Sequence, residues 1–144
     1  MWTSILLSIL FIISMISIYT SYYAVCNKLP NNLAKIQISR YSPQGLEGLI
    51  PMKALAPSED LLRRAKGGQV SNEEYKTEYL NNFISKGLTP ESLYNGLLRF
   101  AKSHGYEGLV LLCYESPDKF CHRHVLAEWL NEIANPKIEE FLWK

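Results

Sequence analysis

A short apolar run at residues 108–113, Gly-Leu-Val-Leu-Leu-Cys, constrains the fold of this chain more than any other segment. Turn residues bound the run, and it is too short for a typical helix. An uninterrupted run of this kind is typical of a strand buried on both faces, as in a parallel sheet. A loop that contains proline follows, and then a helical pattern. The segment therefore predicts a strand–loop–helix crossing.

Capping signals predict where the helices begin and end. Ser58 precedes two acids, Ser71 opens a capping box, and Thr89 stands before Pro90. These signals and the apolar periodicity predict helices at residues 59–66, 72–86, 90–104 and 120–134. Alternating patterns predict strands at residues 16–23 and 34–39. This order predicts an α/β fold, a single domain with helices packed on a small, mostly parallel sheet.

The rest of the chain gives weaker patterns. Residues 43–57 read as a long irregular segment, and residues 137–144 as a short terminal helix. We expect the domain to span residues 15–134, with a tail at 135–144. We expect buried helix faces from Tyr75, Tyr79, Phe83 and Ile84, and from Val125, Leu126, Trp129, Leu130 and Ile133.

Residues 1–14 are nearly all apolar, and no charged residue precedes Lys28. A transmembrane helix needs about 20 apolar residues, and the stretch from Trp2 to Ile18 is only just long enough. A secretory signal would need a basic start and a small-residue cleavage site, which are lacking. We favour an apolar leader at residues 1–14, explained by a start codon assigned too far upstream, in front of a domain that starts at Met15; a membrane segment is the alternative. If the segment did span a membrane, the basic residues after it would keep the domain in the cytoplasm.

Composition limits the function classes. The chain has 144 residues, 47% of them hydrophobic and 20% charged, with a net charge of +1. This balance excludes a broad basic surface for nucleic acid or membranes, but a local basic pocket remains possible. Three cysteines without framework spacing predict reduced thiols in the cytoplasm.

Reactive side chains cluster around the predicted strand–loop–helix crossing. Cys113 ends the strand and Glu115 follows it, while Cys121, His122 and Arg123 begin the helix. A helix start favours a thiolate or a bound anion, and an arginine can clamp a phosphate. Glu115 is either a base or the ionic partner of Arg123. A buried cysteine also packs as a small apolar side chain, so a structural role for Cys113 stays open.

Two familiar cysteine sites do not fit the spacing. Counting from Cys113, the arginine position of cysteine-based phosphatases is occupied by Lys119. Structural zinc sites use cysteine pairs about two to four residues apart, whereas seven residues separate Cys113 from Cys121. We therefore predict no metal site, with a site built from Cys113, Cys121 and one histidine as the minor alternative. The sequence does not identify a cofactor.

A second candidate cluster ends the other predicted strands. Ser39, Arg40 and Tyr41 follow the strand at 34–39, and Thr20 and Tyr22 lie near the end of the first strand. Parallel strand ends share one edge of the sheet, so we expect these side chains near Cys113. Arginine binds anions and tyrosine stacks on rings. The alternative is that they are surface or loop-capping residues.

These motifs resemble the domain-of-unknown-function family 488. The signature is Leu-Leu-Cys-Tyr-Glu at residues 111–115, Cys-His-Arg at 121–123 and the helix that follows. The resemblance runs from Met15 to about Glu132 and includes residues 18–23, 38–41 and 55–58. It implies a shared pocket but no settled activity. Many members carry an acid before the arginine of the second strand, where this chain has Ser39, so no role of that acid is carried over.

Together these observations predict a pocket for an anionic ligand, in an enzyme acting on a nucleotide or nucleic acid. One alternative is a non-catalytic domain that recognises a modified base or nucleotide; another is a purely structural cluster. The expected catalytic residues are Cys113, Glu115, Cys121 and His122. The expected ligand-binding residues are Arg123, Arg40, Tyr41, Ser39, Thr20 and Tyr22.

Overall fold

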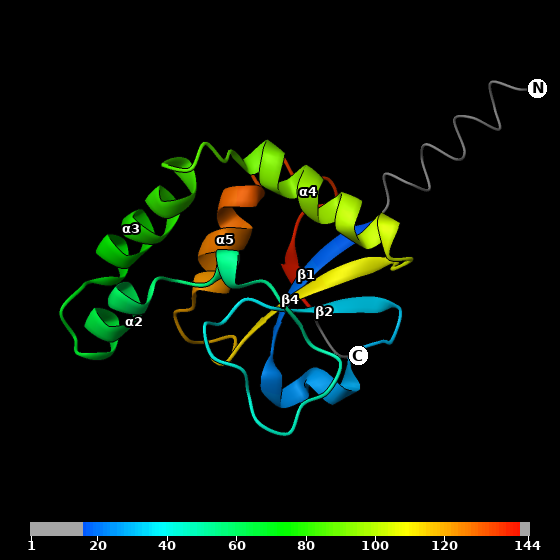
Figure 1. Cartoon of the computed structure of the whole chain (residues 1–144), viewed down its shortest axis with the longest axis horizontal. Coiled ribbons are helices and arrows are strands. Elements are labelled where there is room, and N and C mark those ends of the chain that lie inside the picture. The colour runs from blue at the N-terminus through cyan, green and yellow to red at the C-terminus, as the bar shows by residue number, and fades with distance from the viewer. Residues whose placement is uncertain (1–15, 142–144) are drawn as a thin grey trace, which may run out of the picture.

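A computed structural model describes residues 16–141, which form a five-stranded, all-parallel sheet with α-helices packed against it (Figure 1). The α/β prediction is confirmed. The strands are β1 (Ser17–Tyr22), β2 (Leu33–Gln37), β3 (Ile50–Pro51), β4 (Gly108–Cys113) and β5 (Glu139–Glu140). The helices are α2 (Glu59–Lys66), α3 (Asn72–Ile84), α4 (Pro90–Ser103) and α5 (His122–Leu130), with 3-10 helices η1 (Tyr23–Lys28) and η2 (Lys53–Leu55).

The predicted buried strand, β4, lies at the centre of the sheet order β3-β2-β4-β1-β5. All six of its residues are buried, because strands cover both edges and other layers cover both faces. Leu109, Leu111 and Cys113 belong to the large core beneath the helices. Val110 and Leu112 belong to a smaller core on the opposite face, which η1 helps to form. The continuous apolar run follows from this double burial.

The helix starts confirm the capping predictions. The Ser58 hydroxyl accepts from the Leu61 amide, and both Ser71 and Thr89 form complete capping boxes. The predicted burial of two residues is wrong: Ile84 is 53% exposed and Ile133 is 42% exposed. Ile84 is the last residue of α3, next to the buried stripe that ends at Phe83. Ile133 lies beyond the end of α5, where helical periodicity no longer applies.

The predicted terminal helix is also wrong for the part of the tail that the structure describes. Glu139 and Glu140 form β5, which pairs in parallel with Tyr19 and Thr20 of β1. The Asn131 side chain supports this strand, because it bonds both the amide and the carbonyl of Ile138. The irregular segment at 43–57 likewise contains β3 and η2, which are too short to give a periodic pattern.

The sheet topology opens a crevice at one place. After β2 the chain continues to its neighbour β3, whereas after β4 it passes through α5 to β5 on the far side of β1. Neighbouring strands whose connections diverge leave a crevice outside their carboxyl ends, where α/β proteins bind ligands. The loops after β2 and β4 carry half of the predicted site residues: Ser39, Arg40, Tyr41, Glu115 and Cys121.

Among residues 16–141, no helix has both the length and the apolar character needed to cross a bilayer. The leader predicted at residues 1–14 lies outside the described residues.

The start of β4 requires glycine. A Cβ at Gly108 would lie 2.5 Å from the Ser17 carbonyl oxygen and 2.9 Å from a methyl group of Leu33. Overpacking of this kind costs about 1–3 kcal/mol, so we expect Gly108→Ala to lower the unfolding free energy in urea by that amount. Gly96→Ala within α4 is the matched control. Its Cβ would meet nothing within 4 Å, and it should stabilise the helix by about 0.5–1 kcal/mol. A Gly108→Ala protein as stable as wild type would contradict the packing argument.

Candidate functional site

A cavity of about 660 Å³ lies outside the carboxyl ends of β2 and β4, between their loops and helices α2 and α3. This is the crevice that the topology opens. Six of the ten predicted site residues line it: Ser39, Arg40, Tyr41, Glu115, Cys121 and His122. The convergence arises because the loops after two adjacent parallel strands begin at the same edge of the sheet.

The other four predicted residues lie behind the cavity wall. Cys113 and Arg123 have no exposed surface, and Thr20 is 1% exposed. Tyr22 is half-buried, with its ring centroid 5.9 Å from the guanidinium carbon of Arg123. These side chains form an inner group that supports the lining.

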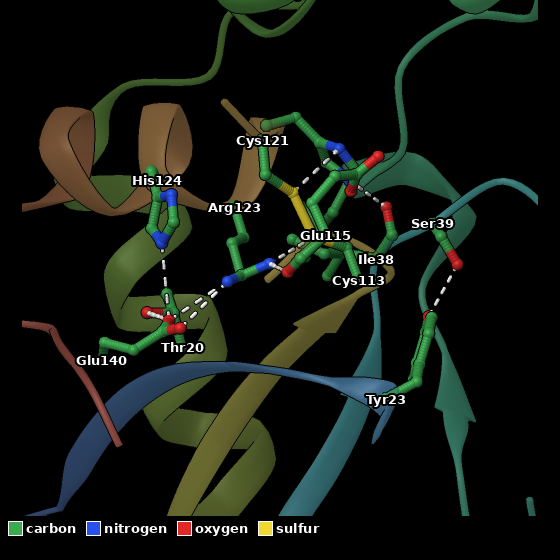
Figure 2. The surroundings of a disulfide bond; sticks show 12 residues. Thr20, Tyr23, Ile38, Ser39, Cys113, Glu115, Cys121, Arg123, His124 and Glu140 are labelled. Atoms are coloured by element: carbon green, nitrogen blue, oxygen red, sulfur yellow. Dashed lines mark hydrogen bonds and ion pairs between the residues drawn. A yellow bond between two sulfur atoms is a disulfide. The ribbon is translucent and has the colours of Figure 1, made fainter. Parts of the chain in front are cut away.

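A disulfide joins the two groups. Cys113 and Cys121 are bonded, with Cys113 in the inner group and Cys121 in the cavity wall (Figure 2). The prediction of reduced thiols is therefore wrong for this pair, because the loop after β4 folds back and brings α5 over the strand end. Cys26 is a free thiol, buried in the smaller core on the opposite face of the sheet.

Arg123 is the centre of the inner group. Its Nε and Nη2 donate to the two carboxylate oxygens of Glu140, at 3.1 and 2.9 Å. Its Nη1 donates to Cys113 Sγ at 2.9 Å and to the Glu115 carbonyl oxygen at 2.6 Å. Figure 2 shows the guanidinium between Glu140 and the disulfide. The ion pair suggested between Arg123 and Glu115 is not formed, since Glu115 contributes its main chain and Glu140 supplies the charge.

Glu140 is the site residue that sequence reasoning missed. It belongs to a two-residue strand in the tail, which no periodic pattern marks. It also accepts a hydrogen bond from Thr20 at 2.5 Å and lies 3.5 Å from His124. The one available signal was indirect: an arginine in a helix packed on the sheet needs a carboxylate partner if it is buried.

The surroundings of Glu140 favour its charged form. Burial by itself would raise the pKa of Glu140, but hydrogen bonds from His124, Arg123 and Thr20 outweigh it and lower the pKa to about 2. The carboxylate therefore stays ionised through the ordinary pH range and neutralises the buried guanidinium.

His122 is held as a neutral ring beside Cys121. Its Nε2 donates to the Ile38 carbonyl at 2.7 Å, which leaves Nδ1 without a proton, 3.9 Å from Cys121 Sγ. Burial lowers the pKa of His122 to about 4, and the positive charges of Arg123 and His124 act in the same direction. The imidazole therefore presents a lone pair to the sulfur.

Ser39 holds the loop after β2. Its hydroxyl donates to the Tyr41 carbonyl at 2.7 Å and lies 2.6 Å from the Tyr23 hydroxyl, from which it accepts. Burial raises the pKa of Tyr23 to about 12, so this phenol remains a donor. The pair fixes the backbone that carries Arg40 and Tyr41 into the cavity wall.

The outer wall of the cavity is cationic and aromatic. Arg40 Nε donates to the Pro57 carbonyl at 3.1 Å, and within residues 16–141 no carboxylate pairs with its guanidinium. Lys66, at the end of α2, is exposed beside it. Three exposed rings complete the wall: Tyr41, Tyr114 and Phe120. Such a wall suits a ligand that combines an anionic group with a flat ring.

Three potential metal-binding atoms lie together at the inner end of the cavity. The ligand atoms of Cys113, Cys121 and His122 are within 4.8 Å of one another. Zinc binds thiolates, and the two sulfurs are bonded to each other here. The group therefore fits a metal only after the disulfide is reduced.

The Glu140 interaction predicts a pH-dependent loss of stability. Glu140→Gln leaves a buried, uncompensated guanidinium, so we expect a loss of about 3–5 kcal/mol in unfolding free energy at neutral pH. The folded-state pKa lies below the ordinary value of 4.5, so the stabilisation is present above that value and disappears as pH falls toward about 2. Denaturation of both proteins across this range should show their difference shrinking with acid.

Glu139→Gln is the matched control, because Glu139 is the exposed neighbour in the same strand. It should leave stability nearly unchanged. Equal effects of the two substitutions would show that Glu140 does not balance the buried charge.

Comparison with protein-family models gives one match, to the model DUF488-N3a, described as the active DUF488-N3 subclade, over residues 18–134. Searches of curated proteins and of solved structures returned no match. The match covers most of the chain and includes β1, β2, β4 and α5. All ten predicted site residues lie in these elements or in the loops after β2 and β4. The chain therefore belongs to the DUF488 family.

Proposed function

We propose that the cavity binds a nucleotide or the end of a nucleic acid and that the protein is an enzyme acting on it. One observation carries the proposal: a single cavity combines an arginine and a lysine, three exposed rings and a cysteine. The rings suit a base, and the cations of Arg40 and Lys66 suit phosphate. The description of the matching family model as an active subclade supports catalysis.

The chemistry rests on Cys121 in its reduced form. Its Sγ belongs to the N-cap residue of α5, where the helix dipole favours a thiolate, and the unprotonated Nδ1 of His122 is 3.9 Å away. In the proposal Cys121 is the nucleophile, His122 accepts the hydrogen bond of its thiol, and Glu115 carries protons at the exposed rim. Arg123 acts on Cys113 and on the loop after β4, not on the ligand.

Cytoplasmic location belongs to the same proposal, because a reducing compartment keeps Cys121 available as a thiol.

Ligand binding is tested first. We expect nucleotides to raise the melting temperature of the reduced full chain, with inorganic phosphate alone as the reference. Probes are nucleoside mono-, di- and triphosphates and a short 5′-phosphorylated DNA strand. Arg40→Ala should weaken binding about ten- to a hundredfold, because it removes charge-assisted hydrogen bonds worth about 1.5–3 kcal/mol. Arg99→Ala removes an exposed arginine of α4 outside the cavity lining and serves as the control. Equal affinities of the two variants would overturn the proposed phosphate contact.

A recognition domain without turnover is the second candidate. The small exposure of Cys121, 3%, beside rings that are about half exposed favours it. Alkylation of Cys121 by iodoacetamide, followed by peptide mapping against pH, separates the two candidates. A thiol that titrates below about 8.5, together with a Cys121→Ser variant that binds but does not turn over its ligand, supports the enzyme. An ordinary thiol and no turnover by wild type support recognition.

A further inference from the structure

The two sulfurs of the disulfide lie in unlike surroundings. Cys121 lines the cavity, whereas Cys113 is fully buried at the end of β4 and does not line it. A molecule inside the cavity therefore meets the disulfide from the Cys121 side. Only one of the two sulfurs is positioned for attack.

The surroundings of the buried sulfur, Cys113 Sγ, favour it as the leaving group when the disulfide breaks. Arg123 Nη1 donates to Cys113 Sγ at 2.9 Å, so negative charge that develops on this sulfur is stabilised at once. Glu140 already balances the guanidinium, and both groups are in place before any bond breaks. A thiol that is stabilised as a thiolate leaves faster in thiol–disulfide exchange.

The attacked sulfur has a different neighbour. His122 Nδ1, which carries no proton, lies 3.9 Å from Cys121 Sγ and can accept the hydrogen of the Cys121 thiol once it is released. The surroundings thus distinguish an entry sulfur, Cys121, from a leaving sulfur, Cys113.

We propose that the Cys113–Cys121 pair performs thiol–disulfide exchange with an anionic low-molecular-weight thiol bound in the cavity. The ligand thiolate attacks Cys121 Sγ and forms a mixed disulfide, while the electron pair of the broken bond goes to Cys113, which leaves as a thiolate. A second ligand thiolate attacks the ligand sulfur of the mixed disulfide and releases Cys121. Two ligand thiolates become one disulfide, and the protein disulfide becomes the two thiolates of Cys113 and Cys121. Either thiolate can then take up a proton from solvent.

We expect the thiol ligand to be anionic because the cations of Arg40 and Lys66 line the same cavity. The inference rests on that function only in assuming that small anions enter the cavity. It does not require a nucleotide to bind or to react.

Single-cysteine variants of the full chain test the order of attack. Oxidised glutathione is the anionic probe, and intact mass measures the adduct. Cys113→Ser should form an adduct at Cys121 at least on the order of tenfold faster than Cys121→Ser forms one at Cys113. Cys26→Ser in each background removes the remaining thiol, which is buried in the other core. Similar rates at the two sites would overturn the inference.

Wild-type protein gives a test that needs no variant to fold. Oxidised protein is mixed with reduced glutathione, quenched with acid and mapped by peptide mass. The mixed disulfide should be found on Cys121, and the neutral thiol mercaptoethanol should react more slowly than glutathione at equal thiolate concentration. A mixed disulfide on Cys113, or none during reduction, would overturn the inference.

A nucleotide competitor separates this inference from the proposed function. If nucleotides bind and slow the reaction at Cys121, one cavity serves both. If nucleotides fail to bind while selective exchange at Cys121 persists, only the proposed function fails. If nucleotides bind but both sulfurs react alike, only the exchange inference fails.

Discussion

The interior of this protein depends on one buried guanidinium. Arg123 has no exposed surface, and a charge in that position is unfavourable unless every partner is present. Its partners come from separate segments: Glu140 from β5, Cys113 from β4 and the Glu115 carbonyl from the following loop. The helix, two strands and the loop are therefore fixed relative to one another by a single side chain. Removing Glu140 would leave the guanidinium without a counter-charge, whereas losing the Cys113 or Glu115 contact would leave one of its N–H groups without an acceptor.

The cavity follows from two such anchors. Arg123 holds the loop after β4, which turns Cys121 and His122 toward the crevice. The hydrogen-bonded pair Tyr23–Ser39 holds the loop after β2 and keeps Arg40 in the opposite wall. Because both loops are tied to buried polar groups, the wall is formed before a ligand arrives, and binding needs little further ordering of the backbone.

The sequence predicted what local signals determine. The capped helices and β4 match the structure because capping and apolar runs act within a few residues. Six site residues meet in one cavity because parallel strands share an edge. Glu140, its strand and the Cys113–Cys121 bond escaped prediction, since each depends on how distant segments meet. A two-residue strand has no periodicity, and the spacing of the two cysteines gives no information about the path of the loop between them.

The position of β5 matters for where this domain ends. The family match stops at residue 134, and the cavity lining lies entirely within the matched region. The carboxylate that neutralises the buried Arg123 nevertheless comes from residue 140. A recombinant fragment trimmed to the matched region would keep every residue of the cavity lining. It would lose Glu140, the carboxylate that balances the buried Arg123.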